Sequence, residues 1–115
     1  MTNDQVDQGF WALHNGLSQA QLMYMDLRDA GDAANAAKAQ SRMTALQGQV
    51  DSLLSKQLAD WQAGAETLIP QLTALSNQAQ QAVTSVSQDV SIAQNIVSAL
   101  GVLDQLIAAG ARFLS

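Results

Sequence analysis

The 115-residue chain contains no cysteine and a single histidine. The lack of cysteine excludes disulfides, thiolate metal sites and cysteine nucleophiles. His14 shares a helix face with Asp7, one heptad earlier, and one histidine with one carboxylate makes a poor metal site. The run of Asp26, Asp29 and Asp32 lacks the glycine turn and the closing glutamate of a calcium loop. The sequence therefore predicts a non-enzymatic protein with no catalytic residue, no metal and no cofactor.

Charge is also scarce, because charged residues make up 13% of the chain, with five basic and ten acidic side chains and a net charge of −5. The sequence predicts no nucleic-acid binding, because such binding requires clustered lysine and arginine. The acidic, polar N-terminus does not resemble a secretory signal, and no run of 18 apolar residues predicts a membrane span. We therefore expect a cytoplasmic protein, with leaderless export still open. A surface rich in glutamine and poor in charge repels copies of itself only weakly, which favours self-association.

The dominant pattern is an apolar stripe with gaps of three or four residues, the period of an α-helix. Aromatic residues are only 4% of the chain and hydrophobic residues are 48%, so the core is made mainly of alanine, leucine, valine and methionine. The pattern predicts one all-α domain over residues 1–115. The stripe comprises Met43, Leu46, Val50, Leu54, Leu58, Trp61, Ala65, Leu68, Leu72, Leu75, Ala79, Ala82, Val86, Val90, Ala93, Val97, Leu100, Leu103 and Ile107.

The predicted fold is an antiparallel three-helix bundle with coiled-coil-like packing, in which a long helical hairpin is extended by a third helix. The helices are expected at about 3–30, 33–66 and 70–109. The second break is placed near 65–70, because three helices of similar length bury their faces better than one long helix with two short ones. The run Val83–Ser87, which is β-branched and serine-rich, is an alternative place for the break.

Local signals mark the expected helix ends. Thr2 and Gln5 fit a capping box at the start of the first helix. Gly31 suits the left-handed geometry that ends this helix, and Asp32 can cap the next one. Pro70 is expected in the first turn of the third helix, where its missing N–H costs nothing. Gly110 is the expected stop of that helix.

A candidate interaction face lies beside the main stripe of the first helix. Trp11, Leu22 and Met25 fall on this flank and widen its apolar sector. They either contact the other helices of the bundle or form a face for a partner or a second copy. Gly9 and Gly16, one heptad apart, could allow close backbone approach there. The favoured function is a helical interaction or assembly protein that forms homo-oligomers or docks on another helical protein.

The charge-poor C-terminal third supports a different class of function. Residues 67–88 carry no charge, and the segments Ile92–Leu103 and Leu106–Leu114 are apolar around Asp104. The alternative is therefore an amphipathic protein that binds a membrane or particle surface, such as a subunit of a pore-forming system. The candidate membrane or partner contacts on this helix are Ile96, Leu100, Leu103 and Ile107.

Overall fold

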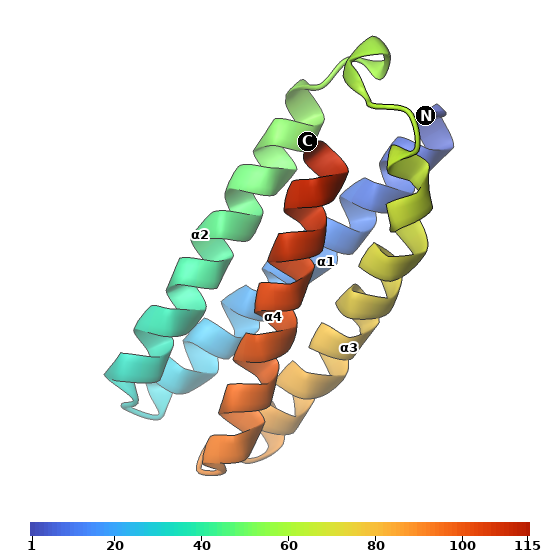
Figure 1. Cartoon of the computed structure of the whole chain (residues 1–115). Helices are drawn as coiled ribbons and strands as arrows, with labels where there is room; N and C mark the ends of the chain where they lie inside the picture. Colours follow the sequence, from blue (N-terminus) through green and yellow to red (C-terminus); the bar gives the residue numbers. More distant parts are fainter.

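The computed structural model describes residues 1–115 and contains four α-helices and no strand (Figure 1). Two short 3-10 turns, η1 and η2, interrupt the connection between the second and third helices. The all-helical prediction is confirmed, but the expected number of three helices is wrong. The elements are α1 (Asn3–Asp29), α2 (Ala33–Ser55), η1 (Leu58–Asp60), η2 (Ala65–Leu68), α3 (Ile69–Gln88) and α4 (Ala93–Leu114).

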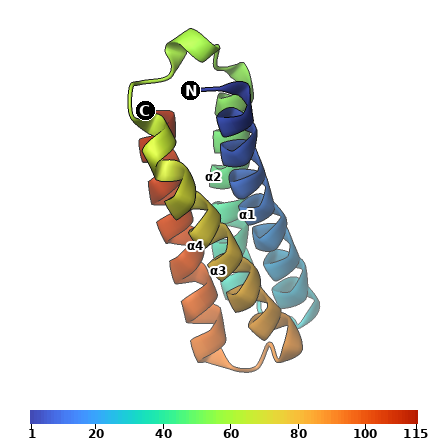
Figure 2. The ribbon, with the colours of Figure 1, turned by 90° about the vertical axis from the view of Figure 1, so that its right-hand side faces the viewer.

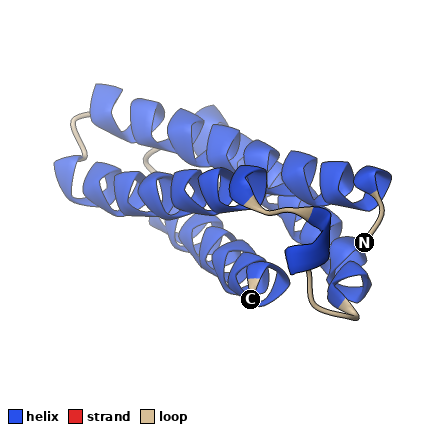
Figure 3. Cartoon of the chain, turned by 90° about the horizontal axis from the view of Figure 1, so that it is seen from above, coloured by secondary structure: helices blue, strands red, loops and turns tan.

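The four helices form two antiparallel hairpins, α1 with α2 and α3 with α4, packed side by side (Figures 1 and 2). Helix α1 lies between α2 and α3, and α4 lies across the bundle from α1. The connection from α2 to α3 therefore crosses the end of the bundle instead of joining neighbouring helices. The molecule measures 46 × 21 × 17 Å along its principal axes, and apart from that connection its loops are short (Figure 3).

The first correction concerns the end of the second helix. The sequence predicts that this helix runs to about residue 66, whereas residues 56–68 form the connection to α3. Helix α2 ends at Ser55, and Gly64 then adopts a left-handed conformation with φ of 88°. The Asp60 carboxylate accepts the Gln57 N–H at 2.9 Å, which stabilises η1 in place of a continued helix. Helix α3 begins at Ile69 with Pro70 in its first turn, so the predicted position of the proline is confirmed.

The second correction concerns the expected helix 70–109, which is divided at residues 89–92. Helix α3 stays regular through Val83–Ser87 and ends at Gln88, so the alternative break is also misplaced. Asp89 makes the turn, because its carboxylate accepts the Ser91 hydroxyl at 2.6 Å and the Ser91 N–H at 3.0 Å. These hydrogen bonds lower the pKa of Asp89 from its ordinary value. This is an Asx turn, which competes with helical hydrogen bonding.

The helix ends around α1 and α2 follow the sequence signals. The capping box is confirmed, since the Thr2 hydroxyl accepts the Gln5 N–H at 3.2 Å and the Gln5 side chain accepts the Thr2 N–H at 2.8 Å. Gly31 has φ of 78°. Asp32 caps α2 by accepting the side-chain and backbone N–H groups of Asn35, and these bonds hold the pKa of Asp32 below its ordinary value.

The core is a single cluster of 26 buried hydrophobic residues that extends along the bundle. At the end crossed by the α2–α3 connection, Trp61 turns inward and its ring centroid lies 4.7 Å from that of Phe113. The Lys56 ammonium lies 5.0 Å from the Trp61 ring centroid. Trp61 therefore closes this end of the core from a loop position.

Three glycines allow α1 and α4 to approach across the bundle. Gly9 lies against the Phe113 ring, and Gly16 lies against Leu106. Gly110 lies against the Gln49 side chain of α2 and against Leu13 of α1, and α4 continues past it to Leu114, so the expected stop at Gly110 is wrong. Gly9 and Gly16 thus provide close approach inside the bundle and not on its outer face.

Candidate interaction surface

The candidate face beside the main stripe of α1 lies on the outside of the bundle. Trp11, Leu22 and Met25 are 55%, 48% and 47% exposed. Together with His14 and Ser18 they are spaced by three or four residues, which places all five on one side of the helix. We call these five residues the outer stripe. The opposite side of α1 is buried, so Trp11, Leu22 and Met25 are the large apolar residues of α1 that remain exposed.

Trp11 belongs to a cluster of three rings on α1. The Phe10 ring meets Trp11 edge-on, with centroids 5.2 Å apart, and stacks on His14 at 5.4 Å. Trp11 and His14 also meet edge-on at 5.7 Å. Pairs of this geometry are worth about 0.5–1.5 kcal/mol beyond area burial. Trp11 is therefore exposed while it contacts two neighbouring rings, and tryptophan is enriched among energetically important interface residues.

A groove of mixed character runs beside Trp11, between the first half of α1 and the last turn of α2, and Asp7 and Lys56 are among its lining residues. Its volume is about 430 Å³, and five of its seven lining residues are hydrophobic. Leu54, 67% exposed, stands at its edge, although the sequence stripe placed this side chain in the core. The groove is lined by Val6, Asp7, Phe10, Trp11, Leu53, Leu54 and Lys56. We call this depression the Trp11 groove.

The other side of Trp11 is polar and uncharged. Gln8 and Asn15 of α1 and Thr73 and Asn77 of α3 line a shallow hollow there. Protein interfaces combine apolar residues with polar ones, and this surface has Trp11 beside polar side chains on both helices. The outer stripe and the Trp11 groove therefore have the composition of a contact surface.

The four candidate contact residues of α4 do not lie on this surface. Ile96, Leu100 and Leu103 are buried and Ile107 is half-buried, so α4 directs these side chains into the core. Helix α4 is the one helix that is long and apolar enough to cross a membrane. Within its most apolar stretch of 18 residues, 44% of the residues are buried in the bundle. A core helix of a soluble protein meets the same criterion.

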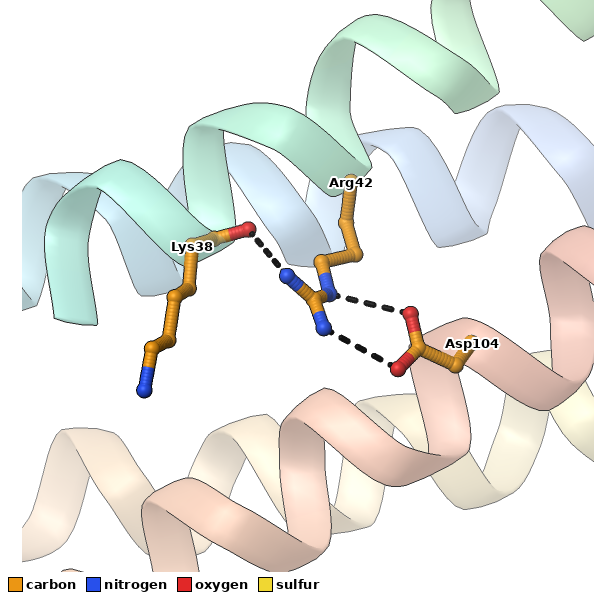
Figure 4. A network of polar contacts seen from close by, with 3 residues as sticks. All are labelled: Lys38, Arg42 and Asp104. Atoms are coloured by element: carbon orange, nitrogen blue, oxygen red, sulfur yellow. Dashed lines mark hydrogen bonds and ion pairs between the residues drawn. The ribbon is translucent and has the colours of Figure 1, made fainter.

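Asp104 ties the polar side of α4 to α2. Its carboxylate accepts the Arg42 Nε–H and Nη2–H, each at 3.0 Å, and the remaining Arg42 nitrogen donates to the Lys38 carbonyl at 3.1 Å (Figure 4). Bidentate pairs of this kind combine charge with fixed geometry. Asp104 thus has its ion-pair partner within the same chain.

Other site chemistry is sparse. No group of three or more histidine, cysteine, aspartate or glutamate side chains could hold a metal ion. Comparison of the chain with family models, with curated proteins and with solved structures found no match.

Proposed function

We propose that this chain is a non-enzymatic assembly protein that uses the outer stripe and the Trp11 groove to self-associate or to dock on another helical protein. One observation carries the proposal: Trp11, Leu22 and Met25 are all exposed on one side of a helix whose other side is fully packed. Contiguous exposed apolar patches on soluble proteins mark interaction sites, and tryptophan and methionine are enriched in them.

The low charge of the surface supports self-association in particular. Only 13% of residues are charged, and Asn, Gln, Ser and Thr supply most of the exposed polarity. Such a surface gives little electrostatic repulsion between copies beyond that of the net charge of −5. Helix α1 itself carries four carboxylates and one arginine, so apolar burial on this helix has to overcome the repulsion between its acidic side chains.

The first test is the molar mass in solution. Size-exclusion chromatography with light scattering should give at least twice the 12.2 kDa monomer mass at tens of micromolar. Micromolar affinity corresponds to a binding free energy of roughly −8 kcal/mol. A Trp11→Ala variant should shift the species toward monomer. A wild-type protein that stays monomeric up to about 100 µM, far above a micromolar dissociation constant, would contradict self-association.

A second candidate function is binding to a membrane or particle surface. The observation that favours it is the length and apolarity of α4, next to an α3 without any charged residue. To reach lipid, however, α4 would have to withdraw Ile96, Leu100 and Leu103 from the core. It would also have to break the Arg42–Asp104 pair. We therefore place this function second.

Liposomes separate the two candidates. We expect the wild-type protein to remain in the supernatant when neutral or anionic vesicles are sedimented. Asp104 opposes insertion by roughly 2.5–3.5 kcal/mol at the bilayer centre. Asp104→Leu should therefore raise vesicle binding sharply only if α4 inserts; in an assembly protein it should promote aggregation instead. Dye release from vesicles by the wild-type protein at neutral pH would favour membrane binding over assembly as the function.

A further inference from the structure

The peptide bond between Asn15 and Gly16 is the one place in the chain where an asparagine precedes a glycine. We infer that this bond is a protected modification site. The folded bundle keeps it unreactive, and unfolding exposes it to a deamidation whose isoaspartate product prevents α1 from packing again. The reaction requires only water, so it goes beyond the proposed assembly role and does not depend on it.

The chemistry is a ring closure within the chain, followed by hydrolysis. The backbone nitrogen of Gly16 attacks the side-chain carbonyl carbon of Asn15 and forms a carbon–nitrogen bond. The side-chain nitrogen of Asn15 takes up the proton of that peptide N–H and leaves as ammonia. Water then opens the cyclic imide at either carbonyl, which gives aspartate or isoaspartate. Glycine favours the ring closure, because it has no side chain to hinder the attack and its backbone is the least restricted of any residue.

The folded helix blocks the ring closure. Asn15 and Gly16 lie in the middle of α1, where backbone N–H groups donate to the carbonyls four residues earlier. Helical backbone angles also hold the Gly16 nitrogen away from the carbonyl carbon of the Asn15 side chain. Gly16 is buried and lies against Leu106 of α4, although the Asn15 side chain is exposed. The attacking nitrogen is therefore covered even though the amide that it would attack reaches solvent.

Exposure of this bond requires the bundle to open, because the other three helices all pack against α1. Helix α1 lies between α2 and α3 and meets α4 at Gly9 and Gly16. Leu13 and Leu17, on either side of the bond, are both buried in the core. Segments that carry the core open only at a free energy close to that of global unfolding. The rate of deamidation should therefore follow the fraction of unfolded chain.

The isoaspartate product does not fit the packed helix. It routes the main chain through the side-chain carbons of residue 15 and so adds an extra carbon to the backbone. The residues after this carbon then lose their helical register with those before it, whereas Leu13 and Leu17 must both enter the core. The aspartate product leaves the backbone unchanged and adds a charge only at an exposed position. Each cycle of unfolding therefore removes some chains from the folded population for good.

The time course of deamidation tests protection by the fold. Wild-type protein is kept at neutral pH in native buffer and in guanidinium chloride above its unfolding transition, and its peptides are followed by mass spectrometry. In denaturant Asn15 should convert faster than Asn35 and Asn77, two internal controls that no glycine follows. In native buffer Asn15 should stay intact over the same period. Equal rates at Asn15 in the two conditions would overturn protection by the fold.

A destabilised variant tests the link to unfolding. In native buffer Phe113→Ala should deamidate at Asn15 at least about tenfold faster than the wild type, because loss of this buried ring raises the unfolded fraction. Val97→Ala is the matched control, since this exposed residue on the same helix should leave the rate unchanged. If the two variants deamidate at the same rate, the bond is reached without unfolding, and the proposed protection is wrong.

Refolding tests the irreversible step. After long incubation in denaturant, the helical circular dichroism recovered on dilution should fall as isoaspartate accumulates at position 15, which enzymatic methylation of isoaspartate measures. Asn15→Gln removes the site and should keep full recovery. Freshly prepared Asn15→Asp carries the charge on a normal backbone and should refold as the wild type does. Isoaspartate chains that refold with wild-type stability, or an Asn15→Gln variant that loses recovery as fast as the wild type, would overturn the irreversible step.

Discussion

Replacing Phe113 with alanine should lower the free energy of unfolding by about 3–5 kcal/mol, the usual cost of removing a buried aromatic ring. The Phe113 side chain is fully buried, with Trp61 on one side and Gly9 on the other. Neither neighbour can fill the space, because glycine has no side chain and Trp61 is fixed in a loop. Since domains of this size are stable by only about 5–15 kcal/mol, the loss would be a large part of the total.

Urea unfolding followed by circular dichroism measures this loss. The control is Val97→Ala on the same helix, which is 61% exposed and should change stability by no more than about 0.5 kcal/mol. Tryptophan emission gives a second reading. In a Trp11→Phe background Trp61 is the one remaining tryptophan, and its emission should move to longer wavelength when Phe113 is removed. Equal stability of the two alanine variants would show that this end of the core is not closed by packing.

The ends of α1 and the start of α2 were predictable because short-range hydrogen bonds determine them. Thr2 and Gln5 bond each other's backbone, and Asp32 bonds Asn35, three residues away in each case. Such bonds form within one turn and do not depend on the rest of the fold. Sequence spacing alone is therefore sufficient to locate them.

The prediction put the break between the second and third helices too late in the sequence, because the buried residues of segment 56–68 keep the spacing of three or four that a helix has. Trp61 and Ala65 are both buried, yet they reach the core from a loop that crosses the end of the bundle. Burial at a spacing of four therefore does not require a helix between the residues. Leu58, in the same run, is exposed, and this shows that the continuous stripe was a coincidence of spacing.

The break at residues 89–92 had a signal that the apolar stripe hid. Asp89 followed by Ser91 is a turn-forming pair, and both lie between apolar residues of the stripe. Size gives a second reason, because a helix over 70–109 would be about 60 Å long at 1.5 Å per residue. The bundle is 46 Å long, so such a helix would have left much of its apolar face uncovered.

The outer stripe was easier to identify than the groove beside it. Trp11, Leu22 and Met25 lie off the main stripe of α1, which indicated a surplus of apolar surface. Leu54 was missed because Leu53 and Leu54 are adjacent, and only one of two neighbours on a helix can face the core. A groove between two helices also depends on how they pack, and periodicity in one segment contains no such information.

Replacing Gly9 with alanine should destabilise the protein by about 1–3 kcal/mol, although alanine is the better helix former. An added Cβ would lie 2.5 Å from both Cε2 and Cζ of Phe113. The ring is buried and bounded by Trp61, so it has little room to move away. Gly48→Ala is the matched control, because this helical glycine is exposed and an added Cβ there meets nothing within 4 Å. It should stabilise by about 0.5–1 kcal/mol, so the two variants should differ in sign.

A double-mutant cycle identifies the ring as the cause. In a Phe113→Leu background the smaller side chain leaves space at Gly9, so Gly9→Ala should cost less there than in the wild type. The expected coupling between the two positions is about 0.5–3 kcal/mol, as found for residues in direct contact. If Gly9→Ala costs the same in both backgrounds, the clash is not with Phe113. If it stabilises the wild type as Gly48→Ala does, then α1 and α4 can separate at this end without loss. The close approach of the diagonal helices would then be a tolerance of the fold and not a requirement of it.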